Sequence, residues 1–159
     1  MQFKTALRAL CDAQVEFVVI GGISALWHGS ARATLLLLEI FYSPVPANLE
    51  RVVAALAPFH PRPRGFPADV PFMWDETTLL NSPLLMLQTE LGAIDLLAEV
   101  AGLGGWNEVN ERAITVSIFD RTIRTLDLPS LITSKRAAGR EKDLAALPEL
   151  ESILESEKQ

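Results

Sequence analysis

The sequence predicts one α/β domain over residues 1–159, with a mixed β-sheet flanked by helices and a helical C-terminus. Three observations support this fold class. The N-terminal half alternates helical spacing with short β-branched runs, and the second half carries two hairpin patterns. Apolar residues make up 49% of the chain and charged residues 21%, which is enough for one core and too apolar for a disordered protein.

Helical and strand patterns alternate in the N-terminal half. Apolar residues recur at helical spacing over residues 3–11, and the β-branched and aromatic run Phe17–Ile20 predicts a buried strand. The glycine pair Gly21-Gly22 ends that strand. Helix-forming residues then predict a helix over Ile23–Gly29, and the run Leu35–Tyr42 predicts the second strand.

A proline-rich segment follows the next predicted helix. Asn48 is placed to cap that helix, which runs to about Leu56. Five prolines lie between Pro58 and Pro71, both included. This density favours an ordered loop or flap over a regular element.

A two-residue turn at Leu91-Gly92 joins the first predicted hairpin, whose strands are 78–90 and 93–97. In that register the facing pairs are Gln88 with Asp95 and Met86 with Leu97.

The last third of the chain predicts a short helix over 106–112 and a second hairpin over 114–119 and 122–126, with its turn at Asp120-Arg121. From Pro129 onward the pattern is helical. We expect that helical part to break near Gly139 and again at Pro148.

The charge balance excludes several function classes. The net charge is −6, from 14 basic and 20 acidic side chains, and this disfavours general binding of nucleic acids or acidic membranes. The single cysteine, Cys11, excludes an internal disulfide and thiolate metal clusters. No apolar stretch reaches the length of a membrane span. We therefore expect a soluble cytoplasmic protein.

Three separated segments resemble one protein family. Residues 21–34, which begin Gly21-Gly22 and contain Arg32-Ala33-Thr34, resemble the opening motif of minimal nucleotidyltransferases of the DNA polymerase beta superfamily. Residues 92–97 resemble the strand that bears the third carboxylate of this family. Residues 131–144 resemble the C-terminal helix motif of its bacterial toxin–antitoxin branch. The resemblance implies the nucleotidyltransferase fold and a triphosphate site, whose residues here would be Gly21, Gly22, Ser24, Arg32, Lys135 and Arg140. On the residues alone, Arg32 is equally a salt-bridge residue. The spacing of the basic cluster Lys135, Arg136, Arg140 and Lys142 favours a solvated helix face over a phosphate site.

The metal-binding pattern of that family is incomplete in this sequence. The family holds two Mg²⁺ ions with Asp-x-Asp on one strand and a third carboxylate on another. The positions that match the pair are Leu36 and Leu38, which offer no oxygen to a hard cation, so Asp95 remains as the single carboxylate. Glu39 stands at the wrong alternation, and a one-residue shift of register would be needed to bring it into the cleft.

These residues predict a catalytically inactive scaffold that holds no metal or cofactor, with the acidic site lost or replaced by design. We expect an apolar cleft that binds a hydrophobic small molecule, a protein partner or a second copy of the chain, lined by Leu36, Leu38, Met86, Leu97 and Gln88. An ordinary buried strand is the alternative interpretation of the leucine run. The alternative function is an active, Mg²⁺-dependent nucleotidyltransferase that moves a nucleotidyl group from a nucleoside triphosphate to a protein or RNA acceptor.

Overall fold

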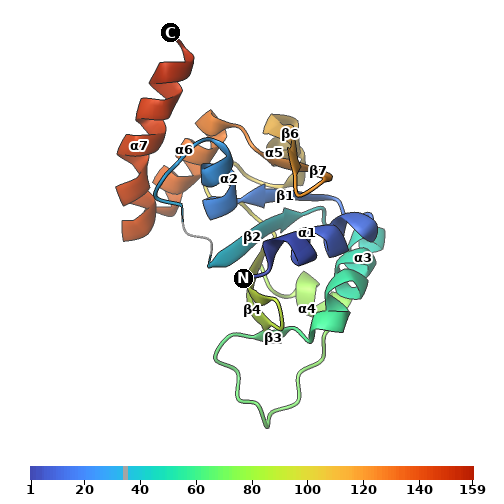
Figure 1. Cartoon of the computed structure of the whole chain (residues 1–159). Coiled ribbons are helices and arrows are strands. Elements are labelled where there is room, and N and C mark those ends of the chain that lie inside the picture. Colours follow the sequence, from blue (N-terminus) through green and yellow to red (C-terminus); the bar gives the residue numbers. More distant parts are fainter. Residues whose placement is uncertain (34–35) are drawn as a thin grey trace.

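The computed structural model describes residues 1–33 and 36–159, and within them it confirms the predicted α/β class with a helical C-terminus (Figure 1). One mixed sheet of seven strands runs through the molecule in the order β3-β4-β5-β2-β1-β7-β6. The strands are β1 Phe17–Ile20, β2 Leu37–Tyr42, β3 Arg62–Pro63, β4 Leu84–Thr89, β5 Gly92–Leu97, β6 Ala113–Ile118 and β7 Arg121–Leu126. The helices are α1 Phe3–Asp12, α2 Gly21–Trp27, α3 Pro46–Leu56, α4 Glu76–Leu80, α5 Trp106–Arg112, α6 Leu128–Ala138 and α7 Glu141–Glu157, with a 3-10 turn at Ala57–Phe59.

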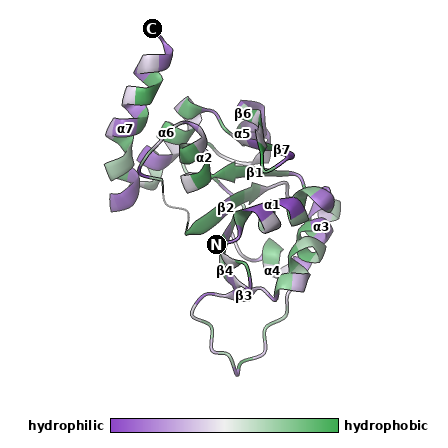
Figure 2. Ribbon diagram, viewed as in Figure 1, coloured by the Kyte–Doolittle hydropathy of each residue, from purple (hydrophilic) through white to green (hydrophobic). Residues whose placement is uncertain are grey.

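Helices cover both faces of the sheet, and each face has its own apolar core. Helices α1 and α3 pack on one face through side chains such as Leu7 and Val52. The second core joins the other face to α2, α5, α6 and α7, and contains Leu131 and Leu150. Figure 2 shows the apolar character concentrated on β1 and β2, in the middle of the molecule.

The alternation of β2 decides which side chains reach which face. β2 runs antiparallel to β1 and parallel to β5, so both of its edges are paired. Leu38 and Ile40 belong to the core under α1 and α3, whereas Phe41 belongs to the other core. Side chains alternate along a strand, so Leu37 and Glu39 share the face of Phe41, and Leu38 faces away from them.

Both hairpins turn one residue earlier than the sequence predicts. The turn between β4 and β5 is Glu90-Leu91, which pairs Met86 with Asp95 and Leu84 with Leu97. The hydroxyl of Thr89 fixes this turn, because it donates to Gly92 O (2.8 Å) and accepts from Leu91 N (3.0 Å). These local side-chain bonds override the preference for glycine inside the turn.

The turn between β6 and β7 is Phe119-Asp120, and both residues have a positive φ. The prediction at Asp120-Arg121 was therefore wrong by one position as well. This backbone conformation matches the twist of a two-residue hairpin, although it is unfavourable for a phenylalanine.

Three other elements differ from the sequence prediction. The segment predicted as a strand from residue 78 begins as helix α4, whose N-cap Asp75 accepts a hydrogen bond from Thr78 N (2.9 Å). The proline-rich segment contains β3, which pairs with β4 at the sheet edge. Helix α7 continues through Pro148, since the buried Leu150 holds its second half against the core. The predicted break at Gly139 is confirmed, with φ of 66° at the C-cap of α6.

Asn48 does not cap α3, which begins at Pro46. Its amide is fully buried and joins the start of β1 to the end of β2: Asn48 Nδ2 donates to Glu16 O (3.0 Å) and to Ser43 O (2.9 Å). Asn48 Oδ1 accepts from Glu16 N (2.7 Å). A buried side-chain amide thus hydrogen-bonds to backbone groups at the ends of these two strands.

The longest helix, α7, has 17 residues, and its C-terminal end extends beyond the rest of the fold (Figure 1). Among the described residues, no helix combines the length and the apolar character that crossing a membrane requires.

Leu36, just before β2, and Leu38, within it, test which side chains of this strand reach the core. Leu38 is fully buried, so Leu38→Ala should reduce the free energy of unfolding by about 2 to 5 kcal/mol. Leu36 is 77% exposed, so Leu36→Ala should change it by no more than about 0.5 kcal/mol. Urea denaturation of both variants measures the difference. Equal losses would contradict the register of β2.

Candidate functional site

Glu39 and Asp95 lie side by side at the centre of the sheet. The parallel register of β2 and β5 pairs these two residues directly, and both side chains are nearly buried, with exposed fractions of 12% and 8%. The expectation that Glu39 faces away from Asp95 was therefore wrong. The β2 positions that face Asp95 are one residue later than predicted, Leu37 and Glu39 in place of Leu36 and Leu38.

The Glu39 carboxylate fills the corner formed by the glycine pair. Gly21 and Gly22 are the first residues of α2, and Gly22 N donates to Glu39 Oε2 (3.2 Å). Gly21 has a φ of 66°, and a Cβ at this position would overlap the Glu39 carboxylate. The side chain of Glu39 thus occupies the place beside the helix start where the sequence analysis expected a phosphate group.

A chain of ion pairs connects Glu39 to α6 and α7. Asp143, almost fully buried, accepts from Arg140 Nε (2.6 Å) and lies 3.4 Å from Lys135 Nζ. The Arg140 guanidinium also lies 3.9 Å from Glu39 Oε1. The hydrogen bond to Asp143 raises the pKa of Arg140, so the guanidinium stays charged between the two carboxylates.

A second basic side chain, that of Arg64, binds Asp95. Arg64 follows β3 and donates through Nη2 to Asp95 Oδ1. Its backbone N–H donates to Met86 O (2.8 Å), so the pairing of this segment with β4 positions the guanidinium. Burial raises the pKa of the Asp95 carboxyl above its usual range, and the Arg64 charge acts in the opposite direction.

Two small cavities adjoin this cluster. They have volumes of about 70 and 100 Å³, and Glu39, Lys135 and Asp143 line both. Arg140 lines the smaller cavity, and Arg32 and Lys142 line the larger one. The two cavities therefore combine two acidic side chains, Glu39 and Asp143, with basic groups from α6, α7 and the segment after α2.

Most residues expected to bind phosphate gather here. Gly21, Gly22, Arg32, Lys135 and Arg140 all line one of the two cavities. Ser24 lines neither of them. It is buried in α2, and its hydroxyl has no hydrogen-bond partner among the described residues.

The structure does not bring the expected apolar cleft residues together. Leu38 lies in the core on the opposite face, and Leu36 is exposed before the start of β2. Met86, Gln88 and Leu97 do share the face of Asp95: Met86 is half exposed, whereas Leu97 packs against the second core. The apolar part of the cleft is therefore its outer edge on β4.

Sequence reasoning missed three charged residues of this cluster as site residues. Asp143 carried a usable signal, because it lies three residues after Arg140 on a helix. Lys142 stands in the basic run of that helix. Arg64 carried no local signal, since it reaches Asp95 only through the pairing of β3 with β4, two strands away in the sheet.

The carboxylates of the cleft do not form a metal centre. In the described part of the chain, no three His, Cys, Asp or Glu side chains are grouped as metal ligands. The alternate position next to Glu39 on the same strand face is Leu37. These donors do not fit a pair of magnesium ions.

Comparison of the sequence with models of protein families and with curated proteins finds no match.

The contact between Gly21 and Glu39 predicts that a substitution of Gly21 lowers the free energy of unfolding more than the same substitution of Gly65. Gly65 has a φ of 75° with open space around it, so Gly65→Ala should cost only the backbone strain, about 1 kcal/mol. Gly21→Ala should cost roughly 2 kcal/mol or more, because it also displaces the Glu39 carboxylate. Thermal and urea unfolding of both variants give the comparison. Equal costs would show that Glu39 moves aside freely.

The raised pKa of Asp95 predicts a pH dependence of stability. The folded state binds this proton more tightly than the unfolded state, so the wild-type chain should lose stability as pH rises from about 4 through the raised pKa. Asp95→Asn cannot ionise, and this variant should lack that loss. The free energy of unfolding of Asp95→Asn should equal that of the wild type at low pH and should exceed it most at neutral pH. Urea denaturation of both chains across this range measures it, and parallel curves would contradict the prediction.

Proposed function

We propose that this protein has the nucleotidyltransferase fold without transferase activity, and that its cleft binds an anionic ligand, the phosphate groups of a nucleotide. The proposal rests on the family resemblance of three sequence segments together with the composition of the cleft. One observation carries the inactive part: on the sheet face of the site, Leu37 stands where a third carboxylate would complete the set with Glu39 and Asp95.

The ion pairs support this interpretation. Arg64 holds Asp95 and Arg140 lies beside Glu39, so neither carboxylate is free to bind a hard cation. A metal would have to displace both basic groups and would still lack a ligand. In this cleft the protein's own cations stand where a transferase would need metal ions.

The balance of charge favours an anionic ligand. Arg32 and Lys142 line the larger cavity without a carboxylate partner among the described residues, and Lys135 and Arg140 add two further positive charges. A phosphate group there would pair with these basic side chains. It would also compete with Glu39 for the corner at Gly22 N.

An apolar ligand, a protein partner or a second copy of the chain is the second candidate. The half-exposed Leu84 and Met86 on the outer edge of the cleft favour it. An active transferase is the third candidate, because Glu39 and Asp95 are adjacent carboxylates. An assay that supplies a triphosphate and an acceptor tests it.

ATP binding and transfer are measured on the same preparation. We expect ATP to bind equally well with Mg²⁺ and with a chelator, and no labelled nucleotidyl group to be transferred with Mg²⁺ or Mn²⁺. Lys142→Ala should weaken binding several-fold. Arg136→Ala removes one charge from the same region, where Arg136 pairs with Glu151 outside both cavities, and should leave binding unchanged.

Labelling that disappears in Asp95→Asn would show that the protein is a transferase and overturn the inactive part of the proposal. Absence of ATP binding, with an environment-sensitive apolar dye bound at the cleft, would favour the second candidate.

The missing ligand can be restored at one position. Leu37→Asp should create a divalent-cation site with Glu39 and Asp95, because all three side chains then share one face of adjacent strands. Mn²⁺ relaxation measurements should detect this site in Leu37→Asp and not in the parent chain. Leu36→Asp adds the same charge at an exposed residue outside the strand and is the matched control. Binding by Leu36→Asp alone would mean that the carboxylate face has been assigned wrongly.

A further inference from the structure

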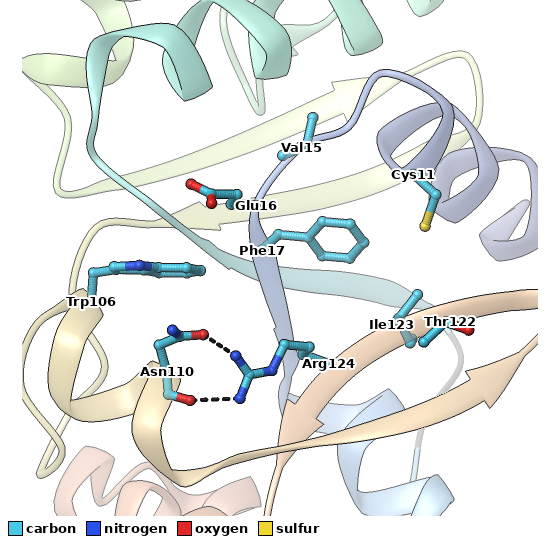
Figure 3. Close-up of a pocket in the computed structure, with 9 residues that line it drawn as sticks. All are labelled: Cys11, Val15, Glu16, Phe17, Trp106, Asn110, Thr122, Ile123 and Arg124. Carbon is cyan, nitrogen blue, oxygen red and sulfur yellow. Dashed lines mark hydrogen bonds between the residues drawn. The ribbon is translucent and has the colours of Figure 1, made fainter.

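A cavity larger than the two beside Glu39 lies at the opposite end of β1 from the glycine pair. It has a volume of about 310 Å³, at the lower end of the range of small-molecule pockets. It forms where β1 and β7 separate, because Val19 and Thr125 are the one residue pair that joins these parallel strands in the described chain. Side chains from α1, β1, α5 and β7 line it (Figure 3).

Arg124 places a positive charge on the wall of this cavity. Its guanidinium donates to Asn110 Oδ1, to Asn110 O (2.7 Å) and to Ala113 O (2.9 Å), all of which are uncharged acceptors. Its Nε is buried and has no partner in the described part of the chain. These bonds hold the end of α5, but none of them neutralises the charge. An arginine without a carboxylate partner retains capacity for an anion.

The rest of the wall combines apolar side chains with the polar groups of Glu16, Asn110 and Thr122. In Figure 3 the Trp106 ring lies on the side of Asn110 and Arg124, whereas the Phe17 ring points the other way, toward Cys11 and Ile123. The Trp106 ring also packs on Phe41, with ring centroids 5.4 Å apart, so its position is fixed by the core. Such a surface suits a flat apolar body.

We propose that this cavity binds a small organic carboxylate whose apolar body packs on the Trp106 ring and whose carboxylate pairs with Arg124. Glu16 lies at the same cavity and is exposed. Its negative charge disfavours ligands with several charges, such as phosphate esters, and leaves a monocarboxylate as the anion of choice. This site is separate from the cleft at Glu39 and does not depend on the function proposed for it.

The probe for this site is 3-phenylpropionate, and its amide, 3-phenylpropionamide, is the neutral control of the same shape. In an NMR titration of the full chain, the acid should bind at least roughly tenfold more tightly than the amide and should shift the indole N–H signal of Trp106. Arg124→Met should abolish the preference for the acid. Arg112→Met removes a charge at the exposed end of α5 and should preserve it.

Because Arg124→Met can loosen the end of α5, the wild-type chain provides a second measurement. Cys11, the single cysteine, lines the cavity, and burial raises the pKa of its thiol. At alkaline pH, 3-phenylpropionate should slow the alkylation of Cys11 by iodoacetamide, and the amide should not. Equal binding of acid and amide, no binding of either, or an unchanged alkylation rate would overturn the proposal.

Discussion

β2 lies at the centre of the sheet, and the choice of which of its side chains point to each face determines both the core and the site. Because β2 is paired on both edges, it cannot slide without breaking its ladders with β1 and β5. In the observed phase Leu38 completes the core under α1 and α3, and Glu39 comes to lie beside Asp95. A shift by one residue would bury a carboxylate in that core and place a leucine next to Asp95, so the apolar core selects the chemistry of the opposite face.

Burying three carboxylates in one region is possible because each lies beside at least one basic side chain. Arg64 covers Asp95 from the β3 side, while Arg140 connects Asp143 with Glu39 from the helical side. Pairs of this kind contribute little net stability, since removing the charges from water offsets most of the attraction. Their effect is positional: they hold two helices and an edge segment against the middle of the sheet in one arrangement.

The sequence was sufficient for the fold class and for most elements, but not for the site. The run Phe17–Ile20, the glycine pair and the stop at Gly139 carry strong local signals, and the structure has a strand, a helix start and a helix end there. Four consecutive leucines carry no alternation, so nothing in residues 35–38 indicates which of them faces the cleft, and residue 35 lies outside the described residues. The contact of Arg64 with Asp95 depends on the pairing of β3 with β4, and no spacing along the chain encodes it.

The narrow junction between β1 and β7 divides the sheet into two mechanical parts. Five strands form one part and the β6–β7 hairpin forms the other, and the backbone ladder between them is reduced to one residue pair, reinforced by the Thr125 hydroxyl, which donates to Val19 O (2.8 Å). The backbone pairing of the hairpin with the rest of the sheet is therefore short, and the buried side chains of Val116, Ile123 and Leu126 carry much of its attachment. Amide protons of β6, which among the described strands pairs only with β7 at the edge of the sheet, should therefore exchange with solvent faster than those of β2, which is paired on both edges.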